Sequence, residues 1–135
     1  MNEFVLPMRV YYEDTDSGGV VYHANYLKFM ERARTEWLRS QGFEQDALLK
    51  EQGLLFAVRS LRLDYLRPGR FNDWLKVHTH LLQCRKASLT FSQTVQRGEE
   101  SALCQAEVKV ACLDAQTFRP RPIPKLILAE ITGGC

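Results

Sequence analysis

The hydrophobic period of this 135-residue chain changes once, close to Gly53, and this change limits the possible folds more than any other feature. Between residues 24 and 40, apolar side chains recur every three to four positions, which predicts one long amphipathic helix. Its stripe comprises Tyr26, Met30, Ala33 and Trp37. After Gly53, apolar and polar residues alternate, which predicts strands with one buried face. Such a chain has a sheet to bury and a single long helix to cover it.

The second half of the chain predicts four strands of roughly ten residues each. A fifth strand is expected before the long helix, at residues 8–13, and a short helix at residues 44–52. Residues 119–124 hold three prolines and cannot continue a central strand. The expected apolar strand faces are Leu61, Leu63 and Tyr65; Leu75, Val77, Thr79 and Leu81; Leu89, Phe91 and Val95; and Ala102, Cys104, Ala106, Val108, Val110 and Cys112.

This order of elements predicts an α+β fold in which a five-stranded antiparallel sheet curls around one central helix. The length fits one domain spanning residues 1–135, with a proline-rich tail from about residue 119. One helix is little cover for strands this long, so pairing of a sheet edge with a second copy is expected.

Composition excludes several classes of partner. The net charge of +2 is too small to indicate nucleic-acid binding, and no stretch approaches the roughly 20 apolar residues of a membrane span. The N-terminus lacks the pattern of a signal peptide, so a reduced, cytoplasmic protein is expected. Cys84, Cys104 and Cys112 fall in apolar, strand-like segments and are expected to be buried free thiols.

Chemistry-bearing residues gather in residues 13–26, between the first strand and the long helix. The segment reads Glu-Asp-Thr-Asp-Ser-Gly-Gly-Val-Val-Tyr-His-Ala-Asn-Tyr. A carboxylate can act as a base, glycines let a ligand approach the backbone, and a helix start offers unpaired N–H groups. Together these groups can stabilise a developing oxyanion beside a base. An ordinary strand-to-helix turn would also use Asp, Thr, Ser and Gly, so composition alone leaves both interpretations open.

The motif Asp-Thr-Asp-x-x-Gly-x-Val-x-His-x-x-Tyr-Leu, at residues 14–27, resembles the signature of hotdog-fold acyl-CoA thioesterases. Its closest resemblance is to the Tol-Pal-associated branch, relatives of 4-hydroxybenzoyl-CoA thioesterase. The following Phe-Met-Glu-Arg-Ala-Arg, at residues 29–34, resembles the start of that family's central helix. The resemblance covers nearly the whole chain, since the expected strand order is also the hotdog order.

The resemblance implies hydrolysis of acyl-CoA, with coenzyme A present only as part of the substrate and no cofactor or metal. It places the catalytic carboxylate at Asp16, acting as nucleophile or general base, and Glu31 is the rival carboxylate. Amides near residues 21–23 would receive the oxyanion charge. Asp14 is expected to hold its own loop. The expected site comprises Asp16 and His23 as catalytic residues and Gly19, Val21, Tyr22, Tyr26 and Glu31 as substrate-binding residues.

Three further positions carry weaker expectations. Arg85 and Lys86 lie between two predicted strands and could meet the phosphates of coenzyme A, but they could equally be ordinary exposed charges. His78 and His80 share one strand face at a spacing that can hold a metal. No third ligand is evident in the sequence, so two solvent-facing histidines are expected.

Partners and competing functions follow from the same resemblance. A homodimer or homotetramer with sites at the subunit interface is expected, with acyl-CoA as substrate and acyl carrier protein as a further candidate partner. A hotdog dehydratase and a non-catalytic module that binds acyl-CoA or acyl carrier protein remain the alternatives, since function resides in the site and not in the fold. The sequence does not indicate the preferred acyl group.

Overall fold

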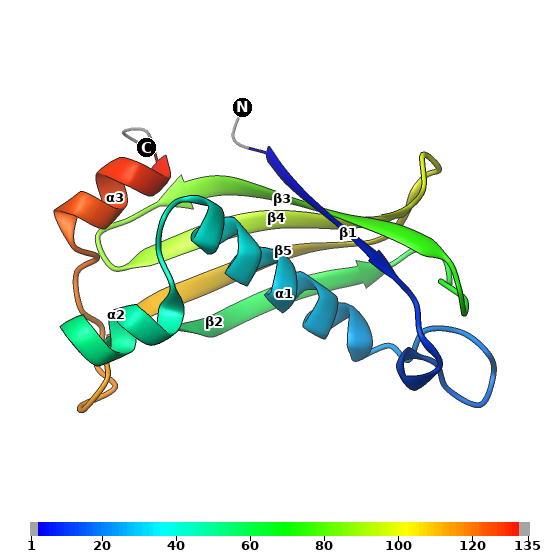
Figure 1. The fold of residues 1–135 in the computed structure, drawn as a ribbon, viewed down its shortest axis with the longest axis horizontal. Helices are drawn as coiled ribbons and strands as arrows, with labels where there is room; N and C mark the ends of the chain where they lie inside the picture. Colours follow the sequence, from blue (N-terminus) through cyan, green and yellow to red (C-terminus); the bar gives the residue numbers. More distant parts are fainter. Residues whose placement is uncertain (1–2, 133–135) are drawn as a thin grey trace.

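A computed structural model of the chain describes residues 3–132 (Figure 1). Its long helix α1 lies against one face of a five-stranded sheet, and the shorter helices α2 and α3 lie towards one end of that sheet. In chain order the elements are β1 (Glu3–Arg9), the 3-10 turn η1 (Tyr12–Asp14), α1 (Asn25–Ser40), α2 (Gln45–Gln52), β2 (Leu54–Tyr65), β3 (Trp74–Cys84), β4 (Ser88–Arg97), β5 (Ala102–Asp114) and α3 (Lys125–Thr132).

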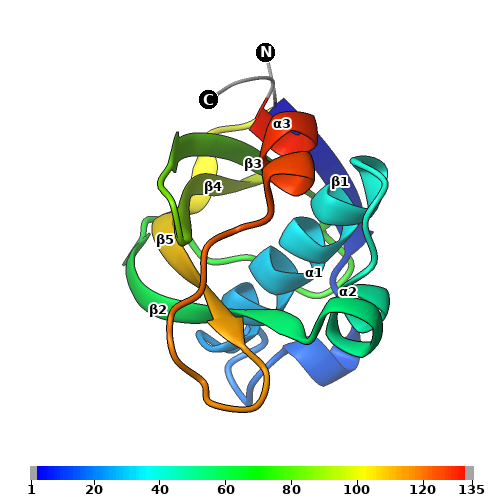
Figure 2. The same cartoon turned by 90° about the vertical axis from the view of Figure 1, so that its left-hand side faces the viewer.

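The strands pair in the order β1-β3-β4-β5-β2, and every neighbouring pair is antiparallel. Figure 2 views the molecule from one end and shows the sheet curving around α1. The expected α+β hotdog architecture is therefore confirmed. Strands β1 and β2 form the two edges of the sheet.

The core lies between α1 and the concave face of the sheet. Phe29, Met30 and Ala33 are almost fully buried, and the Trp37 ring meets Phe91 of β4 edge to face at 5.1 Å. The helix face predicted from the hydrophobic period is therefore the face that packs against the sheet. Helix α2 ends at Gly53, whose positive φ of 65° is a conformation that glycine adopts without strain.

The first strand differs from the prediction. Strand β1 spans Glu3–Arg9, whereas residues 8–13 were expected, and Tyr12–Asp14 form a 3-10 turn instead. Pro7 explains why the pattern misleads, since proline argues against a central strand. It is tolerated here because β1 is an edge strand, with Pro7 opposite Lys76 of β3.

The tail also differs from the prediction, because it forms part of the core. After its prolines it continues into α3, and Ile123, Ile127 and Ile131 are buried. Within α3, the four-residue spacing of Ile127 and Ile131 places both on one helix face, while Ile123 precedes the helix. The tail is bound to the sheet end by a hydrogen bond from the Ile123 amide to the Lys86 carbonyl at 2.8 Å.

Two of the three strand cysteines match expectation. Cys104 and Cys112 are buried free thiols, and burial raises the pKa of both, to about 12 for Cys104. For Cys84 the expectation is wrong, since this residue is disulfide-bonded. Among the described residues, no helix is both long and apolar enough to cross a membrane.

Candidate active site

Asp16 lies at the start of a tight hairpin that closes with a bridge between Thr15 and Val21. The Gly19 amide donates to the Asp16 carbonyl at 3.0 Å, and Gly19 has a φ of +80° that disfavours other residues. The Gly18 amide donates to Asp16 Oδ1 at 2.8 Å, and a Cβ on Gly18 would lie 3.2 Å from that oxygen. Asp16 Oδ2 has no hydrogen-bond partner among residues 3–132 and is exposed in the protomer. The hairpin therefore fixes one carboxylate oxygen and leaves the other available.

The other motif aspartate, Asp14, anchors the hairpin. It is only 4% exposed, and its two oxygens accept hydrogen bonds from the Tyr11 amide at 2.8 Å and from Asn25 Nδ2 at 2.9 Å. Its carbonyl accepts from the Tyr22 amide at 2.8 Å. Since Asn25 begins α1, Asp14 ties both ends of the segment to the helix. The structure thus agrees with a structural role for Asp14.

The amides at the start of α1 divide into two groups. Those of Val21 and Tyr22 are occupied, because they donate to the carbonyls of Gly69 and Asp14 at 2.8 Å each. The amides of His23 and Ala24 have no acceptor within the described part of the chain. The first N–H groups of a helix point outward and carry partial positive charge, so these two can bind an oxyanion. Of the expected residues 21–23, only His23 has a free amide, and Ala24 provides a second one.

His23 presents its backbone more than its side chain. Its exposed ring packs against Tyr22 at 4.6 Å and lies edge-on to Tyr65 at 6.3 Å. Its ring nitrogens make no hydrogen bond to any described residue, so no bond joins the imidazole to Asp16 in this structure. Its carbonyl accepts a hydrogen bond of 2.8 Å from the Tyr65 hydroxyl at the end of β2.

The connection between β2 and β3 packs against the hairpin that carries Asp16. Gly69 accepts from Val21, and its own amide donates to the hydroxyl of buried Tyr26 at 3.0 Å. A Cβ on Gly69 would lie 3.2 Å from side-chain atoms of Val21, Tyr26 and Leu103, so this close approach requires glycine. Burial raises the pKa of Tyr26. Val21 and Tyr26, expected at the substrate, therefore lie buried beneath the hairpin.

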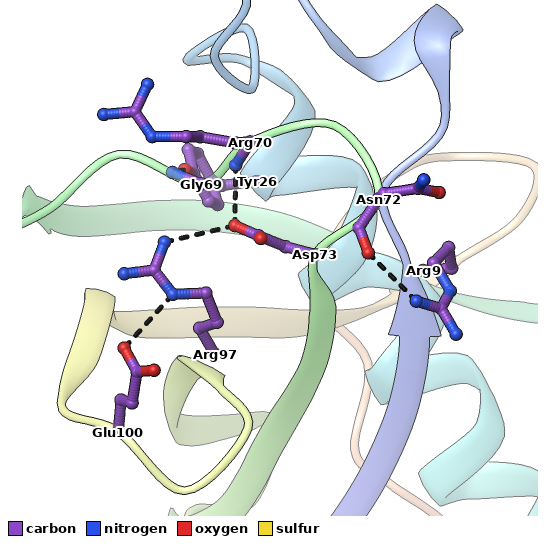
Figure 3. A network of polar contacts seen from close by, with 8 residues as sticks. All are labelled: Arg9, Tyr26, Gly69, Arg70, Asn72, Asp73, Arg97 and Glu100. Atoms are coloured by element: carbon purple, nitrogen blue, oxygen red, sulfur yellow. Dashed lines mark hydrogen bonds and ion pairs between the residues drawn. The ribbon is translucent and has the colours of Figure 1, made fainter.

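The same connection is held to the sheet from two sides (Figure 3). Asp73 Oδ2 accepts from the Arg70 amide at 2.8 Å and from Arg97 Nη1 at 3.2 Å. On the other side, Arg9 Nη1 donates to the Asn72 carbonyl at 2.9 Å. Because Arg70 also bridges Val20, these contacts link strands β1 and β4 to the hairpin that carries Asp16.

A groove of about 490 Å³ runs along α1, between the helix and strands β2, β4 and β5. It is mainly apolar and begins near the helix start, at Leu27 and Lys28. Glu31 lines the groove, whereas Asp16 does not. Arg34 also lines it, and Arg34 Nη1 donates to buried Gln93 at 2.9 Å; burial lowers the Arg34 pKa. The two candidate carboxylates therefore occupy different places, Asp16 on the hairpin and Glu31 in the groove wall.

The remaining candidates lie elsewhere. Arg85 and Lys86 follow β3, while the hairpin contacts the residues before β3, so a strand of about 30 Å separates them from Asp16 within one protomer. His80 is exposed, as expected. His78 is only partly exposed, because its Nδ1 lies 3.1 Å from Glu3 Oε2.

Sequence reasoning missed three residues that shape this site: Asn25, Tyr65 and Gly69. Asn25 stood inside the quoted motif, next to the helix start, and its polar side chain at an apolar boundary was the available signal. Gly69 follows a proline, a pair typical of any turn, so its contact with the hairpin has no signal in the sequence. Nothing in the sequence indicates that Tyr65 reaches His23, since 42 residues separate them.

Comparison with known proteins shows the family of this chain. The thioesterase-like superfamily matches residues 10–131. The acyl-CoA thioester hydrolase YbgC of Escherichia coli O6:H1 is 48% identical over 127 residues, 94% of each chain. The acyl-CoA thioesterase YbgC of Haemophilus influenzae is 48% identical over 95% of this chain and 93% of its own.

Solved structures show the same relationship. The crystal structure of a probable thioesterase from Bartonella henselae superposes with a TM-score of 0.86 at 36% identity, covering 90% of this chain and 99% of its own. The extent of these matches leads to one conclusion. The chain belongs to the thioesterase-like superfamily.

Proposed function

We propose that this protein hydrolyses acyl-CoA thioesters to a free acid and coenzyme A. One observation carries the proposal: the Asp16 carboxylate, with one oxygen unpaired, precedes a helix start at which two successive amides, His23 and Ala24, lack acceptors. The names of the YbgC relatives support the same reaction.

The proposed chemistry follows from charge. Attack on the thioester carbonyl places negative charge on its oxygen, and the His23 and Ala24 amides with the positive end of α1 stabilise that charge. Asp16 either removes a proton from the attacking water or attacks the carbonyl itself. The second route gives a mixed anhydride, which water then cleaves. In both routes the thiol of coenzyme A leaves and one water is consumed.

The site is proposed to be completed by a second copy of the chain. Strand β2 is a sheet edge and exposes Val58, Leu61 and Tyr65, and exposed apolar edges tend to pair. A shared site would also give Arg85 and Lys86 a role towards coenzyme A, despite their distance from Asp16 in their own protomer. The exposed Tyr22 and the groove residue Glu31 are proposed to contact the acyl group. Acyl carrier protein thioesters are proposed as further substrates.

The test compares thiol release from acetyl-, hexanoyl-, palmitoyl- and benzoyl-CoA by wild type, Asp16→Asn and Glu31→Gln. Asp16→Asn is expected to lose about 100-fold or more in kcat, the range for acid–base or nucleophilic groups, while Glu31→Gln stays within about tenfold. Loss confined to Glu31→Gln would retain the reaction and move the carboxylate. A wild type that releases no thiol but still binds the CoA esters would favour a binding module.

A further inference from the structure

We propose that Tyr65 is a positioning residue for the oxyanion site: its hydroxyl fixes the His23–Ala24 peptide so that the Ala24 N–H faces the reacting carbonyl. This inference rests on the proposed thioesterase function. Tyr65 itself need not touch the reacting atoms, because it acts through the backbone.

The argument begins with peptide geometry. In a planar trans peptide the C=O and the N–H point in opposite directions, so a bond that holds the oxygen also fixes the hydrogen. The Tyr65 hydroxyl donates to the His23 carbonyl at 2.8 Å, and this carbonyl shares its peptide with the Ala24 amide. The preceding peptide is fixed likewise, because the Asn25 amide donates to the Tyr22 carbonyl at 2.8 Å. Both unpaired amides therefore belong to peptides whose carbonyls are held.

The two carbonyls are held differently. The Tyr22 carbonyl accepts its bond from a backbone amide of the same helix turn, which any sequence could supply. His23 is bound by a side chain from the distant end of β2, which only a residue with a hydroxyl at position 65 supplies. Without Tyr65, the His23 carbonyl has no other partner in the described chain, and the His23–Ala24 peptide can rotate.

Tyr65 is well placed for this role. Its ring lies 5.8 Å from the ring of buried Tyr26 and 6.3 Å from that of His23, so its direction is set by packing on both sides. Desolvation raises its pKa, so the hydroxyl keeps its proton and remains a donor at neutral pH. A bond to the carbonyl also polarises the peptide and makes its N–H a stronger donor.

The decisive variant is Tyr65→Phe, which removes one oxygen and keeps the ring. Tyr11→Phe is the matched control, since the Tyr11 side chain is exposed, has no assigned role at the site, and its hydroxyl makes no hydrogen bond to a described residue. We expect kcat for acetyl-, hexanoyl- and benzoyl-CoA to fall about five- to twentyfold in Tyr65→Phe. This loss in kcat lies between the effect of removing one ordinary hydrogen bond and that of removing a whole oxyanion donor. KM should change less than about twofold and Tm by less than about 4 °C.

A second readout separates positioning from a general structural effect. In an Asp16→Asn background, hexanoyl-CoA labelled with ¹³C at the thioester carbonyl is bound without rapid turnover, and its infrared C=O stretch reports polarisation. We expect the bound stretch to lie below its frequency in water. Addition of Tyr65→Phe should return part of that shift, whereas addition of Tyr11→Phe should not.

The outcomes distinguish this inference from the function beneath it. Wild-type kcat and an unchanged stretch in Tyr65→Phe, with Asp16→Asn inactive, would overturn the role of Tyr65 alone. A rise in KM together with a fall in Tm, with no change in the C=O stretch, would show a purely structural effect. That result would also overturn the role of Tyr65. If wild type hydrolyses none of the three substrates, the proposed function fails and this inference fails with it.

Discussion

The two ends of the sheet are held together by different forces. At the end that carries Asp16, single polar contacts set the geometry, such as the buried Asp14 carboxylate and the Tyr65 hydroxyl. At the opposite end, the tail packs through Ile123 and, within helix α3, through Ile127 and Ile131. Directional bonds fix a few groups accurately, whereas apolar burial stabilises without fixing direction. The comparison implies that one end serves chemistry and the other serves stability.

The largest expected effect tests the apolar end. Ile127 is 1% exposed, and Ile127→Ala should lower the free energy of unfolding by about 2–5 kcal/mol because it removes buried methylenes and leaves a cavity. The kcat of the folded fraction should be unchanged. Urea unfolding followed by fluorescence measures the free energy of unfolding. Leu126→Ala is the control because Leu126 is 83% exposed. A lower kcat per folded molecule would break the division between the two ends.

The next effect tests the polar end. Asp14→Ala leaves the Tyr11 amide and Asn25 Nδ2 without their acceptors, and loss of the acceptor of the buried Asn25 Nδ2 costs about 1–3 kcal/mol. Because the bond from Asn25 holds the hairpin to α1, kcat should fall by about tenfold or more. Glu13→Ala is the control, since Glu13 is exposed. If stability falls while kcat is retained, the hairpin does not depend on its polar anchor.

A smaller effect concerns alkaline pH. Burial raises the Cys104 pKa from 9.0 to about 12, so above pH 9 the unfolded chain releases a proton that the folded chain retains. Stability from this group is therefore complete below pH 9 and is lost as pH rises towards 12. The wild type should lose up to about 1.4 kcal/mol per pH unit more steeply than Cys104→Ala between pH 9 and 11. Equal slopes in urea unfolding would argue that the thiol ionises freely.

The smallest expected effect tests whether the end of the sheet that carries α3 also contacts the substrate. If Arg85 and Lys86 contact coenzyme A in a neighbouring copy, the double variant Arg85→Gln/Lys86→Gln should raise KM about threefold to tenfold with kcat unchanged, as for exposed charge pairs. Added salt should narrow the difference. A KM that matches wild type at low salt would confine substrate binding to the other end.

Much of the fold was predictable because its signals are local and repeated. The stripe of Tyr26, Met30 and Ala33 and the alternation along β3 to β5 indicated the central helix and its sheet. Strand β1 was misplaced, since Pro7 concealed it and the β-branched and aromatic run Val-Tyr-Tyr at residues 10–12 imitated a strand. Helix α3 was missed because the prolines before it suggested an irregular tail, although Ile127 and Ile131 are spaced as on one helix face.

The site was predictable only where its parts are contiguous in sequence. Residues 14–27 formed a recognisable motif, so Asp16, Gly19 and the helix start could be named. The supports at Tyr65, Gly69 and Asp73 come from β2 and the connection after it, and only folding brings them to the motif. Likewise, the use of the Val21 amide by Gly69 could not be inferred from the order of residues.

Pro7 has a consequence for assembly. The sheet has two edges, but a proline removes one backbone donor from β1, so a strand from another molecule finds an incomplete template there. The other edge, β2, contains no proline and shows apolar side chains. A sheet with two equivalent free edges can add copies without limit, whereas one with a single usable edge stops at two. If copies pair through β2 as proposed, Pro7 thus favours a closed pair over a growing fibre.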